Sequence, residues 1–149
     1  MTQLLHFPIK VVQLKIEHMF PTGEGGVVMP LIPEEAIPYF ENMIYLPMVL
    51  TILEKDRTIF EKAPFKLKRP YIVLVEEAGK QVQKELKQTH MYMKRHSMKV
   101  LRGEGDDMFT EYVFFHGGYE EHRRYLNVRL RNRVEELLSI YLAVVEKLR

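Results

Sequence analysis

Five arginines within eleven residues are the side chains in this sequence best suited to binding chemistry. They are Arg123, Arg124, Arg129, Arg131 and Arg133, and Tyr119 and Tyr125 lie beside them. Guanidinium groups bind phosphates and carboxylates in bidentate geometry, and arginine and tyrosine are enriched in protein interfaces. These seven residues are therefore the candidate binding site for a protein partner or an anion.

Glutamates flank the arginines closely enough to neutralise most of their charge. Residues 120–136 carry a net charge of only +1, because the set also contains Glu120, Glu121, Glu135 and Glu136. If the stretch is helical, Glu120 can pair with Arg124, and Arg131 with Glu135, at a spacing of four. Two interpretations stay open: a salt-bridged, solvated helix face, or a site for phosphate, nucleic acid or an acidic partner.

No other stretch combines the residues that catalysis or metal binding requires. The donors His116, Glu120, Glu121 and His122 lie close together, but their spacing matches no HExxH pattern. The sequence also has no Walker loop, no GxSxG elbow and no GxGxxG fingerprint. We expect no catalytic residue, no metal and no cofactor, and hence a protein that is not an enzyme.

Nucleic-acid binding is the alternative function. It would use the arginines as phosphate contacts, or residues 70–118 as a helix followed by a β-wing. The wing interpretation is weakened by Glu104, Asp106 and Asp107, which would bring negative charge to the phosphates.

Composition favours one folded, cytoplasmic domain. The chain has 149 residues, 46% of them hydrophobic and 28% charged, with a net charge of +2 and no cysteine. The longest apolar run, residues 43–53, is shorter than the ~20 residues of a membrane span. The N-terminus lacks the basic region of a secretory signal. We expect no membrane partner.

Apolar periodicity predicts three helices, near residues 34–62, 71–97 and 119–148. Pro47 is expected to break or kink the first of them. Gly79 lies on the apolar seam of the second and suggests a close helix crossing. The seam of the third helix continues to the last residues and is expected to exceed what two partner helices can cover, which favours self-association.

Between the second and third helices the period changes to that of a strand. Residues 98–115 predict one β-hairpin, with turn formers at its centre, and Gly117 and Gly118 are expected to end it before the last helix. The predicted fold class is mainly α, of the α+β type: a three-helix antiparallel bundle with one β-hairpin before the C-terminal helix. Its predicted core comprises Ile44, Ile52, Val75, Val82, Leu86, Val113, Phe115, Leu130, Val134, Leu137 and Tyr141.

The glycine-rich stretch after residue 20 divides the chain into two parts. Residues 29–149 are expected to form the single helical domain, and residues 1–28 an N-terminal extension. That extension is either a poorly packed strand or upstream sequence read in frame, since GEGG can be encoded by a ribosome-binding sequence at a suitable distance before Met29.

Several segments together resemble a known bacterial family. They are NMIYLPMVLTIL from residue 42, PFKLKRPY, MKV, GYEE at residues 118–121 and LRNRVEELLSIYL. Over residues 34–149 the chain is similar to the YhjD family of spore-forming bacteria. The resemblance implies a cytosolic helical domain and assigns no functional residue.

The function expected from the sequence is that of a small cytosolic protein acting through protein contacts. The contact would be with a protein partner or with a second copy in a homodimer. The alternative is a nucleic-acid-binding or regulatory protein that uses the arginine-rich start of the C-terminal helix.

Overall fold

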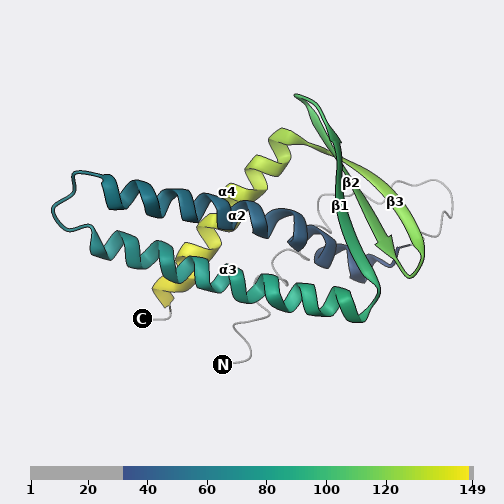
Figure 1. Ribbon diagram of the computed structural model, residues 1–149, viewed down its shortest axis with the longest axis horizontal. Helices are drawn as coiled ribbons and strands as arrows, with labels where there is room; N and C mark the ends of the chain where they lie inside the picture. Colours follow the sequence, from purple (N-terminus) through teal and green to yellow (C-terminus); the bar gives the residue numbers. More distant parts are fainter. Residues whose placement is uncertain (1–31, 148–149) are drawn as a thin grey trace.

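The protein combines a long helical hairpin, a three-stranded sheet and a final helix that crosses the hairpin (Figure 1). A computed structural model describes residues 32–147. A short 3-10 turn, Glu34–Ala36, leads into α2 (Ile37–Lys62), which is followed by α3 (Arg69–Arg95). Strands β1 (Met98–Gly105), β2 (Phe109–His116) and β3 (Tyr119–Leu126) precede α4 (Asn127–Lys147). The mixed α+β class is confirmed; the predictions for residues 1–28 lie outside the described residues.

Helix α2 runs without interruption through Pro47, so the predicted break is wrong. Proline removes one backbone hydrogen bond and costs roughly 3 kcal/mol in a helix interior. Its neighbours Leu46 and Val49 are almost completely buried, and burying such side chains contributes about 1.5–3 kcal/mol each. Packing of the flanking residues therefore outweighs the local cost.

Helices α2 and α3 pack antiparallel along their length (Figure 1). Gly79 lies between them, yet a Cβ atom there would meet Leu50 Cδ1 at 4.0 Å, an ordinary contact distance. The helices are thus not closer at Gly79 than an alanine would allow.

Replacing Gly79 with alanine should raise the free energy of unfolding by roughly 1 kcal/mol, because alanine loses less backbone entropy in a helix. Urea unfolding followed by circular dichroism measures this change. Gly118→Ala is the matched control, since a φ of 90° makes a side chain unfavourable there, and it should destabilise the protein. A destabilised Gly79→Ala protein would show that the interface is tighter than its geometry indicates.

The sheet has three antiparallel strands in the order β1-β2-β3, one more than predicted. Residues Tyr119–Leu126 pair with β2 along their whole length, so the predicted start of the last helix at residue 119 is wrong. Gly117 and Gly118 do not lead into a helix; their φ values of 54° and 90° suit a two-residue type I′ turn. The helix begins only at Asn127.

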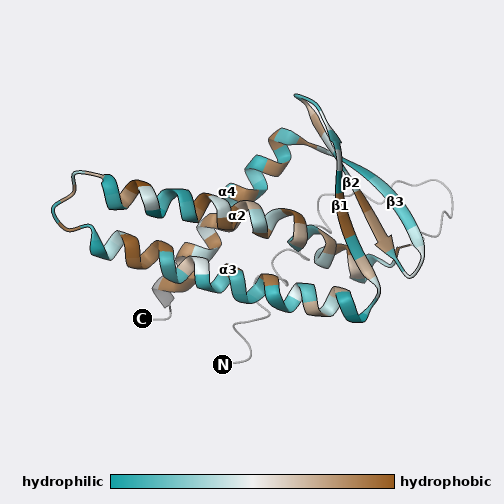
Figure 2. Ribbon diagram, viewed as in Figure 1, coloured by the Kyte–Doolittle hydropathy of each residue, from teal (hydrophilic) through white to brown (hydrophobic). Residues whose placement is uncertain are grey.

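Helix α4 crosses α2 and α3 obliquely instead of extending an antiparallel bundle (Figure 1). Its apolar seam packs against both: Leu130, Val134, Leu137, Tyr141 and Val145 are all buried. The seam is therefore covered from Leu130 to Val145, and its last residues, where it was expected to exceed its partner helices, lie outside the described side chains. In Figure 2, apolar residues recur along α2 and alternate with polar residues along α3 and α4.

The face of β2 that packs on the core is the opposite of the one predicted. Tyr112 and Phe114 are buried, whereas Val113 and Phe115 are only partly buried. Phe114 stacks on Phe40 of α2 with 4.5 Å between ring centroids. Ile52 and Leu86 pack at the edge of the core, and the other seven predicted core residues are buried.

Within the described residues, one helix, Glu34–Lys62, is long and apolar enough to cross a membrane by length and composition, with a mean hydropathy of 1.3. Within the fold, 61% of that apolar window is buried. Such burial is ordinary for the core helix of a folded domain.

Candidate functional site

The structure divides the seven predicted site residues between two elements. Tyr119, Arg123, Arg124 and Tyr125 lie on β3, and Arg129, Arg131 and Arg133 lie on α4. Because side chains alternate along a strand, Arg123 and Tyr125 face the core side of the sheet and Arg124 the other. The predicted helical pairing of Glu120 with Arg124 is accordingly wrong. Arg129 and Arg131 are exposed, and Tyr119 is exposed beside the β2–β3 turn.

On the core side, Glu41 and Arg133 are buried charged groups at the junction of α2, β3 and α4. The Tyr125 hydroxyl donates a hydrogen bond to Glu41 Oε1 at 3.2 Å, and Arg133 Nη1 donates to Glu136 Oε2 at 2.8 Å. Burial raises the pKa of Glu41, and the Tyr125 hydrogen bond and nearby guanidinium charges partly oppose this shift. Burial likewise lowers the pKa of Arg133. The Tyr125–Glu41 hydrogen bond joins β3 to α2, and the Arg133–Glu136 pair lies within α4. Burial makes Glu41 and Arg133 inaccessible to a large ligand.

Arg123 is also engaged within the protein. Its Nε donates to Glu121 Oε1 at 2.9 Å, and its guanidinium lies over the Phe114 ring at 5.2 Å from the centroid. Two of the five arginines, Arg123 and Arg133, are therefore engaged in contacts within the protein.

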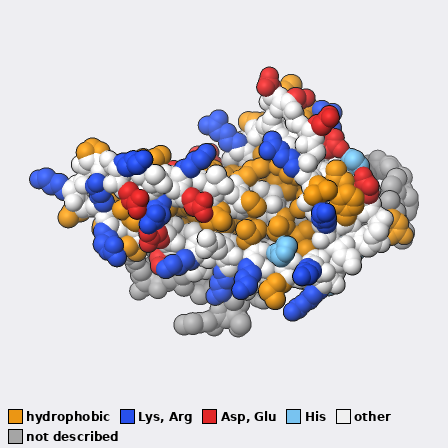
Figure 3. Space-filling model, viewed as in Figure 1, with side chains coloured by type: hydrophobic (Ala, Val, Ile, Leu, Met, Phe, Trp, Pro, Cys, Tyr) orange, Lys and Arg blue, Asp and Glu red, His pale blue; other side chains and the backbone are white. Residues whose placement is uncertain are grey.

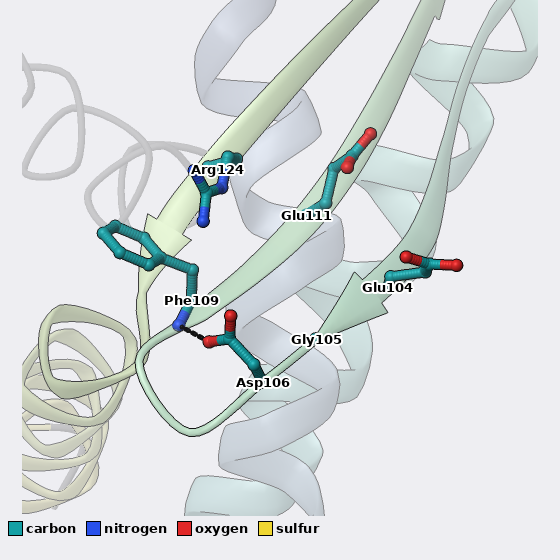
Figure 4. Close-up of a pocket in the computed structure, with 6 residues that line it drawn as sticks. All are labelled: Glu104, Gly105, Asp106, Phe109, Glu111 and Arg124. Carbon is teal, nitrogen blue, oxygen red and sulfur yellow. Dashed lines mark hydrogen bonds between the residues drawn. The ribbon is translucent and has the colours of Figure 1, made fainter.

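Arg124 lines a shallow hollow of about 300 Å³ at the end of the sheet (Figure 4). Its guanidinium lies 4.3 Å from the centroid of the Phe109 ring. The other lining residues are Glu104, Gly105, Asp106 and Glu111. The Asp106 carboxylate accepts hydrogen bonds from the backbone N–H groups of Phe109 and Met108, at 2.7 and 2.8 Å, which lower its pKa. Its carboxylate is therefore occupied in holding the β1–β2 turn.

The face of the sheet turned away from α2, called here the outer face, has an apolar centre. Strand register places Leu101, Val113 and Phe115 on it, with Lys99 at the β1 edge and Glu120 at the β3 edge. Leu101 is 44% exposed. In Figure 3, hydrophobic side chains gather over the sheet. The alternation of apolar residues in β2 was the sequence signal for this face. It predicted Val113 and Phe115 for the core, whereas they lie on the outer face.

His122 lies on the same outer face between two carboxylates. Its Nδ1 contacts Glu111 Oε1, and its Nε2 lies 2.6 Å from Glu120 Oε1. Hydrogen bonds to Glu111 and then Glu120 raise the pKa of His122. Residues 32–147 contain no cluster of three or more potential ligands suited to a metal ion.

A second set of buried polar groups lies between α2, α3 and α4. Glu85 is 3% exposed, and its Oε1 has no hydrogen-bond partner in the described part of the chain. Asn42 Nδ2 donates to Thr89 Oγ1 at 3.3 Å, and the Thr89 hydroxyl donates to the Glu85 backbone carbonyl. Burial raises the pKa of the Glu85 carboxyl to about 7. Sequence periodicity did not single out Glu85, because glutamate is ordinarily on the wet face of a helix.

Comparisons with known proteins agree on one family. The model of the YhjD protein family matches residues 31–146. The chain is 38% identical over 120 residues to "Uncharacterized protein YhjD" of Bacillus subtilis (strain 168), an alignment that covers 80% of this chain and all of that protein. No solved structure matches. The resemblance stated from the sequence is confirmed, and the chain belongs to the YhjD family.

Proposed function

We propose that this protein is a non-enzymatic, cytoplasmic interaction module, and that the outer face of its sheet binds a second copy of the chain. The observation that carries the proposal is the partly exposed apolar centre of that face, formed by Leu101, Val113 and Phe115. Partly exposed apolar residues rimmed by charges are typical of protein interfaces.

Charge on the rim favours a second copy as the occupant. One row across the sheet consists of Lys99, Phe115 and Glu120: basic, apolar and acidic in turn. In a face-to-face pair with its two-fold axis parallel to β2, β1 of one copy lies over β3 of the other. Lys99 then faces Glu120 of the second copy, and Phe115 faces Phe115, so the surface is complementary to itself.

Two further features support a role in binding and not in catalysis. Two charged groups beside the hollow are already engaged. The Asp106 carboxylate accepts a hydrogen bond from the Phe109 backbone N–H in the β1–β2 turn, and the Arg124 guanidinium lies over the Phe109 ring. Glu41 links α2 to β3 through Tyr125, and Arg133 is buried and paired with Glu136 within α4. The nucleic-acid alternative has lost much of its support, because Arg123 and Arg133 are engaged or buried within the protein.

Sedimentation equilibrium of the full chain tests the dimer. We expect a concentration-dependent dimer that Leu101→Glu shifts to monomer, because the change places an unpaired charge in the apolar centre. Lys99→Glu and Glu120→Lys should each weaken the dimer roughly tenfold, since symmetry makes every rim pair occur twice. The double variant Lys99→Glu/Glu120→Lys should recover most of the loss.

Arg102→Glu is the matched control, because Arg102 is exposed on the same strand but belongs to the opposite face. It should leave the dimer unchanged. A wild-type monomer at high concentration, or equal effects of Arg102→Glu and Lys99→Glu, would overturn the proposal. Salt-sensitive binding of mixed-sequence DNA by the wild-type chain, lost with Arg129→Glu/Arg131→Glu, would instead favour the nucleic-acid alternative.

A further inference from the structure

The connection between α2 and α3 exposes apolar side chains at the end of the molecule remote from the sheet (Figure 1). Residues 59–71, called here the hairpin tip, include Ile59, 62% exposed, and Leu67, 77% exposed. Phe65 and Tyr71 are each 48% exposed. Four large apolar residues at one protruding end exceed the scattered exposure usual on a protein surface.

Aromatic contacts give the hairpin tip a defined shape. Phe60 and Tyr71 stack with 5.6 Å between ring centroids, and Phe65 packs against Tyr71 at 5.4 Å. Lys68 Nζ donates to the Glu61 backbone carbonyl at 2.9 Å, which ties the loop to the end of α2. Leu67 is therefore presented outward by a supported loop.

The hairpin tip is also basic. It contains Lys62, Lys66, Lys68 and Arg69 against one carboxylate, Glu61, for a net charge of +3. That carboxylate is paired with Arg57 at 3.2 Å. Figure 3 shows Lys/Arg and hydrophobic side chains side by side at this end.

We propose that the hairpin tip docks on a lipid bilayer with anionic headgroups. Protruding apolar side chains can enter the interfacial region while neighbouring lysines contact phosphate and carboxylate groups, as in interfacial membrane anchors. An acidic protein partner would match the charge, but a convex tip provides no groove for it, and a stable protein interface needs roughly 800 Å² on each side. A bilayer needs no such shape complementarity. The expectation of no membrane partner rested on the absence of an apolar run of ~20 residues that could span a bilayer. Docking of the hairpin tip on the bilayer surface does not require such a run.

Vesicle sedimentation with the full chain tests the proposal. We expect binding to phosphatidylcholine vesicles that contain about 30% phosphatidylserine, decreasing as salt rises, and little binding to phosphatidylcholine alone. Lys66→Glu should weaken binding about 25-fold, because it changes the charge by two units and each unit near the surface is worth roughly a factor of five. Leu67→Glu should weaken binding at least about tenfold, since it replaces an inserting side chain by a charge.

Val128→Glu and Lys84→Glu are matched controls, because both residues are exposed on helices away from the hairpin tip. They should bind vesicles as the wild type does. Because all the variant positions are exposed, the variants should keep the wild-type circular dichroism spectrum and melting transition.

The absence of tryptophan provides an independent measurement. Phe65→Trp should show a blue shift of its emission on adding the anionic vesicles, and Tyr119→Trp, 53% exposed beside the sheet, should show none. Failure of the wild type to bind, or equal binding by the tip variants, would overturn the proposal. Binding to soluble polyglutamate without binding to vesicles would assign the tip to an acidic protein and also overturn it.

Discussion

Replacing Phe114 with alanine should lower the free energy of unfolding by about 3–5 kcal/mol. The ring is completely buried, and it stacks on Phe40, so the change removes apolar area and a contact between the sheet and α2. A loss of this size is a large part of the ~5–15 kcal/mol that stabilises an ordinary domain. Urea unfolding at low protein concentration, followed by far-UV circular dichroism, measures it.

Phe115→Ala is the matched control for this prediction. It removes the same side chain from the adjacent position, but Phe115 faces outward and is only partly buried. We expect a loss of about 1 kcal/mol or less. Equal losses for the two variants would mean that the sheet does not pack on α2 through the Phe114 face.

Replacing Glu85 with glutamine should remove a strong dependence of stability on pH. The pKa of Glu85 is raised by burial from 4.5 to about 7, so folding favours the protonated carboxyl. Its contribution to stability is fully present below pH 4.5 and is lost as the pH rises to about 7. At 1.36 kcal/mol per pKa unit, the wild type should lose about 3 kcal/mol across this interval relative to Glu85→Gln.

The difference in unfolding free energy between wild type and Glu85→Gln, measured from acid to mildly alkaline pH, isolates this one group. Other titrating groups are common to both proteins and cancel. The charge of Glu85 raises the pKa values of Tyr141 and Tyr39, but both phenols stay neutral over this pH range and leave burial as the cause of the Glu85 shift. Glu54→Gln, at an exposed position on α2, should leave the pH profile unchanged. Parallel wild-type and Glu85→Gln profiles would contradict the prediction.

The helices were predictable from sequence where one apolar stripe repeats over many turns. The seams of α3 and α4 identified Val75, Val82, Leu137 and Tyr141 as buried. Local rules failed where tertiary packing opposed them. Pro47 predicted a break or a kink, and buried neighbours on both sides keep α2 continuous, so the break does not occur.

The candidate site was less predictable, because charged residues tolerate either secondary structure on a solvated surface. The segment Tyr119–Leu126 has a helical charge spacing, yet pairing with β2 along its length holds it as a strand. The better signal was the pair Gly117–Gly118, which favours a tight hairpin turn between two strands. Misplacing this boundary assigned the arginines to one helix face, whereas they occupy two elements and both faces of the sheet.

Strand β3 passes directly into α4, and Asn127 at that boundary is fastened to the β1–β2 turn. Its backbone N–H donates to the Met108 carbonyl and its Nδ2 to the Asp106 carbonyl, both at 2.8 Å, while its Oδ1 accepts from Thr110 Oγ1 at 2.7 Å. No flexible joint separates the sheet from the helix, so α4 is a rigid lever whose angle follows the sheet. Amide protons of β2, β3 and the first turns of α4 should consequently exchange with solvent as one cooperative unit, and a shift of the sheet should move α4 against α2 and α3, on which it packs.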